Sequence, residues 1–138
     1  MLFRSGRILI LADNAGETVF DRLLIETIGK EVVYAVKEKP ILNDALEADA
    51  IEAGLDRVAT IISSGVDSPG TLLSRTSEDF LQIYYASDVI IAKGQGNYEA
   101  LSGQKENIYF LFQAKCQTLA RTIETSVGGM IVKNAKRS

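Results

Sequence analysis

Five short apolar runs divide this chain of 138 residues, and each run ends in a cluster of polar residues and glycines. Near-continuous apolar runs of this length are typical of strands that are buried on both faces of a sheet. Between the runs, apolar residues recur at helical spacing, and strands that alternate with helices form right-handed βαβ units. We therefore expect an α/β fold with three layers: a Rossmann-like, doubly wound, mostly parallel sheet of about five strands with helices on both faces. The expected strands cover residues 7–11, 31–36, 57–62, 87–92 and 107–112.

The predicted strand order is 3-2-1-4-5, which places a switch point between the first and fourth strands. In such a sheet the carboxyl ends of the parallel strands share one edge, and ligands bind in the crevice outside it. The polar clusters are therefore expected to meet at one site, although they are far apart in the sequence. In the helix over residues 44–53, Leu46, Ala50 and Ile51 are expected to face the core. Further expected elements are helices over 16–28, 78–86 and 116–124, a helical turn at 72–75, a brief helix near 98–101 and a possible edge strand at 130–132.

The composition predicts a single domain over residues 1–138 and argues against two kinds of partner. A net charge of −3 argues against binding to nucleic acid, because phosphate backbones attract clustered Lys and Arg. The basic residues at 133–138 are typical of a solvated terminus. No apolar run approaches the roughly 20 residues that a membrane helix needs, so no membrane partner is expected. The single cysteine, Cys116, is typical of a reducing cytoplasm, which is the expected location, and of a small buried hydrophobic residue.

The chain contains no histidine. This absence excludes Ser-His and Cys-His nucleophile pairs, histidine acid–base steps and the usual zinc sites. Catalysis by such a chain would rely on carboxylates, amides, lysine and any metal that these groups hold.

The clusters after the first two strands supply oxygen donors. Asp13 and Asn14 follow the first strand, and Asp44 follows the second. A structural alternative stays open, because Asn14 and Glu17 fit a reciprocal helix cap, and Asn43 or Asp44 fits a cap of the next helix. Capping does not require Asp13, and the ends of the first two strands are expected to be neighbours. Three oxygen donors would then surround one point, which suits Mg²⁺, Mn²⁺ or a similar hard cation rather than zinc or copper.

Two further clusters follow the third and fourth strands. Residues 65–70 form a loop with two glycines and a proline, in which Asp67 either makes a turn or contacts a substrate. Residues 93–97 superficially match the dinucleotide fingerprint G-x-G-x-x-G, but Glu99 stands in place of the third glycine. This stretch fits a phosphate cradle better, with backbone N–H groups at a helix start and the positive charge of Lys93.

Four of these motifs together, at residues 12–17, 40–44, 65–71 and 93–97, resemble the damage-control phosphatases. This family, long described as domain of unknown function eighty-nine, is related to the phosphatase domain of some pantothenate kinases. The resemblance covers nearly the whole chain in the right order, although Gln117 stands where relatives often carry proline. The family normally has a helical region before its first strand that helps to cover the site. The resemblance thus implies that the chain is the carboxyl-terminal part of a longer architecture, completed by that region or by a helical partner.

The resemblance also implies a metal-dependent phosphatase that hydrolyses small phosphorylated metabolites such as sugar phosphates. In this family an Asp-Asn pair and a later Asp bind a divalent metal (Mg, Mn, Co or Ni), which maps onto Asp13, Asn14 and Asp44. The cation would polarise a phosphoryl oxygen and activate a water, in place of a general base. Lys93 is expected near the transferred phosphoryl group, which makes these four the expected catalytic residues. The residues expected to contact the substrate are Gly16, Glu17, Asp67, Gly94, Gly96 and Asn97.

Three alternatives compete with this hypothesis. A covalent aspartyl-phosphate route through Asp13 is disfavoured, because enzymes that use it usually carry a second aspartate two residues later, where this chain has Ala15. A non-catalytic module that binds a metal or a phosphorylated metabolite, or a subunit that needs a helical partner, belongs to a different functional class. Nucleotide-dependent methyl transfer suits the topology, but the chain lacks a glycine-rich adenosine motif after its first strand.

Overall fold

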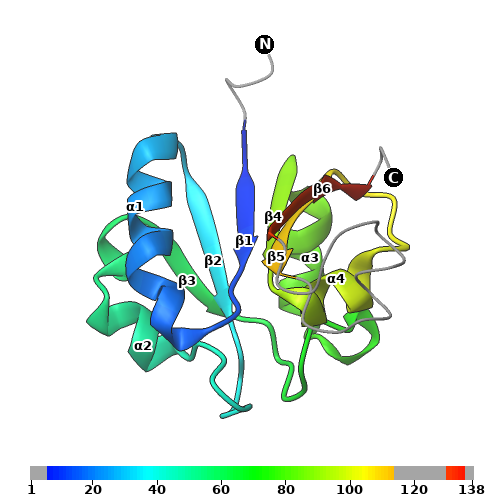
Figure 1. Cartoon of the computed structure of the whole chain (residues 1–138), viewed down its shortest axis with the longest axis horizontal. Coiled ribbons are helices and arrows are strands. Elements are labelled where there is room, and N and C mark those ends of the chain that lie inside the picture. The colour runs from blue at the N-terminus through cyan, green and yellow to red at the C-terminus, as the bar shows by residue number, and fades with distance from the viewer. Residues whose placement is uncertain (1–5, 114–129, 136–138) are drawn as a thin grey trace.

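The computed structural model describes residues 6–113 and 130–135, which contain one sheet of six strands (Figure 1). The strands are β1 (Ile8–Leu11), β2 (Val32–Val36), β3 (Thr60–Ser63), β4 (Val89–Lys93), β5 (Ile108–Gln113) and β6 (Met130–Asn134). Their order is β3-β2-β1-β4-β5-β6, and all neighbours are parallel except β5 and β6. The α/β class, the predicted order of the first five strands and the switch point between β1 and β4 are confirmed. The possible edge strand is present as β6.

Helices cover both faces of the sheet, as a doubly wound fold requires (Figure 1). One face carries the α-helices α1 (Thr18–Ile28) and α2 (Glu47–Glu52), and the other carries α3 (Glu78–Ala86) and α4 (Gln95–Leu101). The connections include three short 3-10 helices, η1 (Ala15–Glu17), η2 (Leu55–Arg57) and η3 (Leu73–Arg75).

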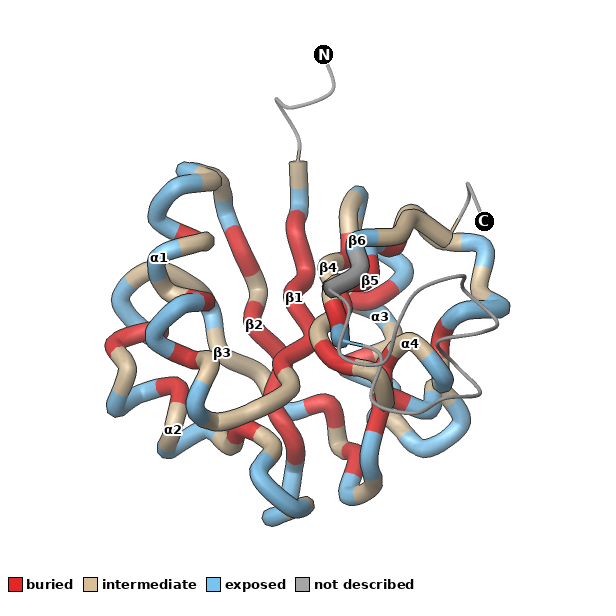
Figure 2. The backbone as a smooth tube through the Cα atoms, viewed as in Figure 1, coloured by how far each residue is buried: buried red, intermediate tan, exposed pale blue. Residues whose placement is uncertain are grey.

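The central strand β1 is buried on both faces, as its continuous apolar sequence predicts. Ile8 and Ile10 join the apolar cluster beneath α1 and α2, whereas Leu9 and Leu11 join the cluster beneath α3 and α4. This division follows from the alternation of side chains along a strand. Buried residues run along the middle strands in Figure 2. The carboxyl ends of the parallel strands therefore project from a well-packed core.

Two sequence signals fix the helix ends as predicted. The Ser77 side chain accepts a hydrogen bond of 3.1 Å from the backbone N–H of Phe80, so it caps the first turn of α3. Gly29 ends α1 in the left-handed conformation, with φ at 66°, where glycine has no steric penalty. The predicted bounds of the helix over residues 78–86 and the helical turn near 72–75 are confirmed.

The helix expected over residues 44–53 begins later than predicted. In the structure it starts at Glu47, and Asp44 instead forms an isolated backbone bridge with Asn14. The Asp49 carboxylate accepts a hydrogen bond from the backbone N–H of Leu46, so this aspartate stabilises the helix start. The expectation that Ile51 faces the core is wrong, because this side chain is 49% exposed. The helix expected near residues 98–101 is α4, which begins earlier, within the glycine-rich stretch.

The α1 helix turns an apolar stripe outward. Val19, Phe20 and Leu23 are 57%, 70% and 56% exposed, whereas its buried residues are Thr18, Asp21 and Ile25. Two polar side chains therefore point inward on this helix, next to the carboxyl ends of the strands.

No helix within the described ranges is long and apolar enough to cross a bilayer. The helix predicted over residues 116–124, together with Cys116 and Gln117, lies outside the described residues.

Replacing the α3 cap tests this account of the helix start. We expect Ser77→Ala to lower the free energy of unfolding by about 1 kcal/mol, because the Phe80 N–H loses its acceptor. Urea denaturation measures this change, and Ser74→Ala, an exposed serine on η3, serves as the matched control. Equal stability of the two variants would contradict the capping role.

Candidate active site

The segments that follow β1 and β2 are tied together by their backbones at the carboxyl edge of the sheet. The N–H of Ala15 donates to the carbonyl of Asn43, and the N–H of Ala45 donates to the carbonyl of Asp13, both at 2.7 Å. Asn14 and Asp44 are paired between these bonds. The structure thus brings the three predicted oxygen donors onto two adjoining pieces of backbone, although 30 residues separate Asn14 from Asp44 in the sequence.

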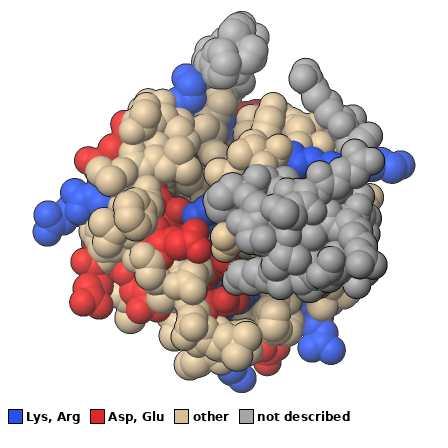
Figure 3. Space-filling model, in the orientation of Figure 1, with Lys and Arg blue, Asp and Glu red and all other residues tan. Residues whose placement is uncertain are grey.

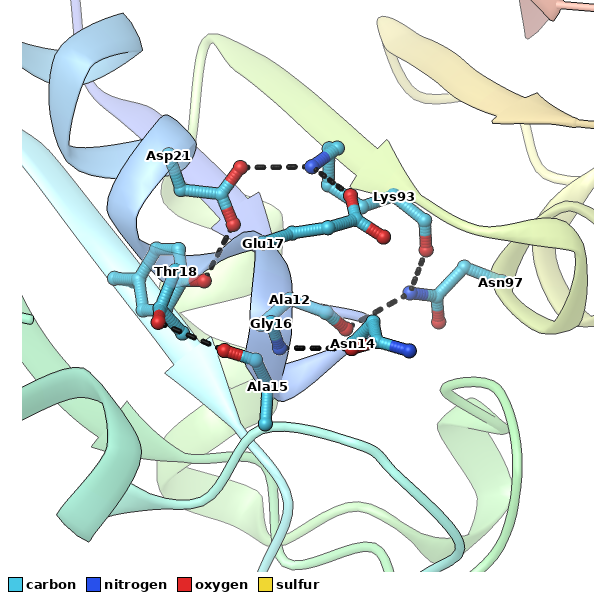
Figure 4. A network of polar contacts seen from close by, with 10 residues as sticks. Ala12, Asn14, Ala15, Gly16, Glu17, Thr18, Asp21, Lys93 and Asn97 are labelled. Carbon is cyan, nitrogen blue, oxygen red and sulfur yellow. Dashed lines mark hydrogen bonds and ion pairs between the residues drawn. The ribbon is translucent and has the colours of Figure 1, made fainter.

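The two capping alternatives have different outcomes. The Asn14 side chain accepts a hydrogen bond of 2.7 Å from the backbone N–H of Gly16 and caps η1 (Figure 4). The reciprocal partner predicted for this cap, Glu17, instead receives a hydrogen bond from Lys93. Asp44 caps no helix, because Leu46 is the residue that precedes α2. Capping therefore explains the position of the Asn14 side-chain oxygen, but it does not explain the position of the Asp44 carboxylate.

A buried lysine that the sequence analysis did not select lies next to this pair. Lys37 follows β2 directly and is 5% exposed. Its Nζ donates a hydrogen bond of 2.5 Å to the carbonyl of Gly70 and lies 4.0 Å from Oδ2 of Asp44. Burial lowers the pKa of Lys37, and the nearby carboxylates of Asp44 and Asp13 oppose this effect. The sequence signal was a lysine attached to the end of a buried strand, where a charge needs a partner.

Lys93, the last residue of β4, is held by two carboxylates from α1 and the segment before it. Its Nζ donates to Oε1 of Glu17 and to Oδ1 of Asp21, both at 2.7 Å (Figure 4). The second oxygen of Asp21 accepts a hydrogen bond of 2.6 Å from the hydroxyl of Tyr34 on β2. We call these four residues the Lys93 cluster. Asp21 and Tyr34 are not among the residues predicted from the sequence, although an aspartate and a phenol inside otherwise apolar segments were an available signal.

The ionisation of the Lys93 cluster follows from its geometry. Burial would lower the pKa of Lys93, but the Asp21 and Glu17 carboxylates together raise it above its ordinary value of 10.5. Burial and the Asp21 charge raise the pKa of Tyr34, so the phenol stays protonated and its hydroxyl donates a hydrogen bond to Asp21. Lys93 is therefore a fixed positive charge at neutral pH.

The glycine-rich stretch makes room for Asp13. Gly94 has φ at 89°, and a Cβ atom there would lie 2.3 Å from Cγ of Asp13. Gly96 packs against the backbone of Gly70, whose own Cβ would lie 2.4 Å from the Gly96 carbonyl oxygen. These glycines allow three loops to approach one another at the carboxyl edge.

Asn97 connects these loops rather than facing solvent. It is 3% exposed, and its Nδ2 donates a hydrogen bond of 2.8 Å to the carbonyl of Lys93. Its Oδ1 accepts a hydrogen bond of 2.7 Å from the hydroxyl of Thr71. A substrate contact through Asn97, which stays a prediction, would have to replace one of these internal bonds.

Asp67 lines a cavity that the three predicted metal ligands do not line. It is exposed, and it lines this cavity of about 700 Å³ beside β3 and α3 together with Glu38, Ser63 and Phe80. A role for Asp67 in substrate binding, which stays a prediction, thus needs a substrate that extends into this cavity.

The donor set fits a hard divalent cation. Two carboxylates and one amide, from Asp13, Asp44 and Asn14, supply only oxygen atoms, which Mg²⁺ and Mn²⁺ accept readily. Within the described ranges no group of three or more His, Cys, Asp or Glu side chains is arranged to hold a metal ion, so the amide would be needed as a ligand. Acidic side chains gather at the centre of the face shown in Figure 3, with a basic side chain beside them.

Comparison with known proteins identifies relatives over nearly the whole chain. The family model of the damage-control phosphatase ARMT1-like domain matches residues 2–131. The chain is 41% identical over 138 residues to the damage-control phosphatase PH1575 of Pyrococcus horikoshii and 37% identical over 134 residues to a damage-control phosphatase of Archaeoglobus fulgidus. An uncharacterized protein of Methanocaldococcus jannaschii is 44% identical over 133 residues. These alignments include 96%, 94% and 91% of this chain, respectively.

The fold comparison agrees with the sequence comparison. The crystal structure of PH1575, described as a DUF89 family protein, matches this fold with a TM-score of 0.90 and covers 96% of this chain. The match covers 48% of that crystallised chain, and the sequence matches cover 44% to 48% of the relatives. The chain therefore spans about half the length of the relatives that it matches.

The raised pKa of Lys93 predicts how stability depends on pH. The ion pairs of Lys93 stabilise the folded protein fully below pH 10.5, and this contribution is lost as the pH rises through the higher pKa of the folded state. We expect the free energy of unfolding to fall more steeply above this pH in the parent protein than in Lys93→Met. Urea denaturation from about pH 8 to about pH 11.5 measures the difference. The control is Lys105→Met, at an exposed lysine, whose free energy of unfolding should change with pH as it does in the parent. Parallel pH curves for Lys93→Met and the parent would show that the ion pairs do not stabilise the fold.

The tight approach of Gly94 to Asp13 predicts a selective effect of a methyl group. We expect Gly94→Ala to lower the free energy of unfolding by about 1–3 kcal/mol, because the backbone is left-handed and the Cβ meets the Asp13 carboxylate. Gly103→Ala, where no atom lies within 4 Å of the new Cβ, should change stability by no more than about 0.5 kcal/mol. Thermal and urea unfolding of both variants check this prediction, which fails if the two behave alike.

Proposed function

Because this chain belongs to the damage-control phosphatase ARMT1-like family, we propose that it is a metal-dependent phosphomonoesterase acting on small phosphorylated metabolites such as sugar phosphates. The observation that carries the proposal is the backbone pairing of Asn14 with Asp44 at the carboxyl edge of the sheet. This pairing supports the proposal because it brings the segments of Asn14 and Asp44 together at the edge where the Lys93 ammonium also lies. A hard cation and a fixed positive charge at one edge suit a phosphate monoester dianion.

The residues that would hold the cation are Asp13, Asn14 and Asp44. When bound, a divalent cation supplies Lewis acidity, which polarises a phosphoryl oxygen and acidifies water. The chain contains no histidine to act as a general base, so the cation would take over the activation of water. Mg²⁺, Mn²⁺, Co²⁺ and Ni²⁺ are the candidates for an oxygen donor set in this family.

Lys93 and the glycine-rich stretch would act on the transferred group. Lys93 would stabilise negative charge on the equatorial phosphoryl oxygens, since phosphoryl transfer depends mainly on positioning and electrostatic stabilisation. Gly16, Gly94 and Gly96 would let the backbone approach the phosphate, because none of them carries a side chain that would block it.

The remainder of the substrate would contact residues outside this centre. We propose that Asp67 lies along its path, that Glu17 meets the substrate beside Lys93, and that Asn97 keeps α4 and the loop before η3 in the geometry that the substrate requires. A sugar phosphate is the proposed class, and the cytoplasm is the proposed compartment of the reaction.

Metal-restored hydrolysis tests the proposed function. Chelator-stripped protein is assayed with p-nitrophenyl phosphate after Mg²⁺, Mn²⁺, Co²⁺ or Ni²⁺ is restored singly. We expect turnover to return with metal and to fall at least about 100-fold in Asp13→Ala, because the cation loses a carboxylate ligand. Asp56→Ala, an exposed aspartate on η2, is the matched control and should retain the turnover of the parent. Full metal-dependent turnover in Asp13→Ala would refute the assignment.

A second candidate function is supported by the outward apolar stripe of α1, formed by Val19, Phe20 and Leu23. Contiguous exposed apolar side chains mark surfaces that bind another protein segment. The chain could therefore serve as a module that binds the metal and the phosphorylated metabolite, with catalysis completed by a helical partner. Stabilisation of the chain by metal and a sugar phosphate, without any turnover, would favour this function over independent hydrolysis.

A further inference from the structure

We propose that Glu17 occupies, in the unliganded protein, the position on Lys93 that a phosphoryl oxygen takes when substrate binds, while Asp21 and Tyr34 hold Lys93 in place during the exchange. The inference rests on the proposed function, since it concerns the same anion site. It assigns positioning roles to Asp21 and Tyr34 and makes Glu17 a built-in competitor of the phosphate.

The two carboxylates that hold Lys93 differ sharply in burial. The Asp21 side chain is 3% exposed, whereas the Glu17 side chain is 42% exposed, although both lie 2.7 Å from the same Nζ. A carboxylate that is already near water gives up an ion pair at small cost, since exposed pairs contribute little to stability. A buried carboxylate that loses its partner is left with an uncompensated charge, which is strongly unfavourable. Glu17 is therefore the partner that can leave.

Asp21 is held from a second side. Its other oxygen accepts the hydroxyl hydrogen of Tyr34, which is fully buried in the middle of β2. The Asp21 carboxylate thus bridges two strands of the sheet, from Tyr34 on β2 to Lys93 on β4. Lys93 keeps this bond when Glu17 leaves, so its ammonium stays at the carboxyl edge.

The charges of the Lys93 cluster require such an exchange. One ammonium faces two carboxylates, so the cluster as it stands carries net negative charge and repels a phosphate anion. Movement of Glu17 into water leaves Lys93 neutralised by Asp21 alone, and it frees the ammonium N–H that Glu17 had accepted for a phosphoryl oxygen. A phosphate dianion carries more charge than one carboxylate, which favours it in the competition for that donor.

Removing the competitor tests the exchange directly. The probe is inorganic phosphate, titrated into the parent protein with saturating Mg²⁺ at constant ionic strength by isothermal titration calorimetry. We expect Glu17→Ala and Glu17→Gln both to lower the Kd for phosphate about two- to fivefold. Glu52→Gln, an exposed glutamate on α2, should leave the Kd unchanged. An unchanged or higher Kd in Glu17→Ala overturns the proposal, as does tightening in Glu17→Gln alone, which would reflect a new bond from the amide.

Replacement of two buried tyrosines by phenylalanine tests the positioning role of Tyr34. In Tyr34→Phe the second oxygen of Asp21 loses its donor and turns to the Lys93 ammonium, which draws the ammonium away from the anion. We expect the Kd for phosphate to rise about threefold or more. The control is Tyr84→Phe, since Tyr84 is equally buried but donates to Glu106, outside the Lys93 cluster. Equal Kd values in the two variants, with similar losses of thermal stability, would reduce Tyr34 to a structural residue and contradict the proposal.

These measurements separate this inference from the proposed hydrolysis. A parent protein that binds phosphate but hydrolyses no ester would refute the proposed function and still report the exchange through the Kd values. A parent protein that hydrolyses p-nitrophenyl phosphate, with Glu17 variants that bind phosphate no more tightly, would retain the proposed function and refute the exchange. Absence of saturable phosphate binding in the parent and in both Glu17 variants also overturns the exchange.

Discussion

Two backbone hydrogen bonds between the segments after β1 and β2 determine where the polar groups of this protein lie. The bonds join Ala15 to Asn43 and Ala45 to Asp13, and they fix Asn14 opposite Asp44. The N–H of Lys37, the residue after β2, donates a hydrogen bond of 3.1 Å to the carbonyl of Ala45, so the short antiparallel bridge is tied back to the end of a buried parallel pair. The packing of the sheet therefore sets the separation of the oxygen donors. The proposed cation site would therefore gain its precision from the core rather than from flexible loops.

Buried charge at the carboxyl edge is balanced by contacts between strands. Lys37 bonds to the Gly70 carbonyl and lies near Asp44, and Lys93 bonds to Asp21 and Glu17. A buried ammonium without such partners would be costly. Each lysine also links loops that the chain sequence keeps far apart. The edge is thus a network of opposite charges at the end of the sheet, and the proposed exchange would replace only its exposed partner, Glu17.

The sequence predicts the strands and helices of this protein because these elements depend on local patterns. The alternation of strands and helices predicts the doubly wound parallel sheet, and Ser77 followed by helical spacing predicts the bounds of α3. The start of α2 was predicted wrongly because Asp44 pairs with Asn14, and a contact across 30 residues overrides a local capping preference. Asp21 and Tyr34 were missed for the same reason, since Lys93 lies 72 residues from Asp21. Convergence at the switch point was predictable, whereas the partners of each charge depend on tertiary contacts.

The central claim is that the paired segments after β1 and β2 form one cation site. The most direct measurement is Mn²⁺ binding, followed by electron paramagnetic resonance, in metal-stripped parent protein, in Asp44→Asn and in the exposed control Asp56→Asn. The account predicts one bound Mn²⁺ per chain in the parent and the control, with affinity at least about tenfold lower in Asp44→Asn. Unchanged affinity and stoichiometry in Asp44→Asn would contradict it, because the Asp44 carboxylate would then not bind the cation.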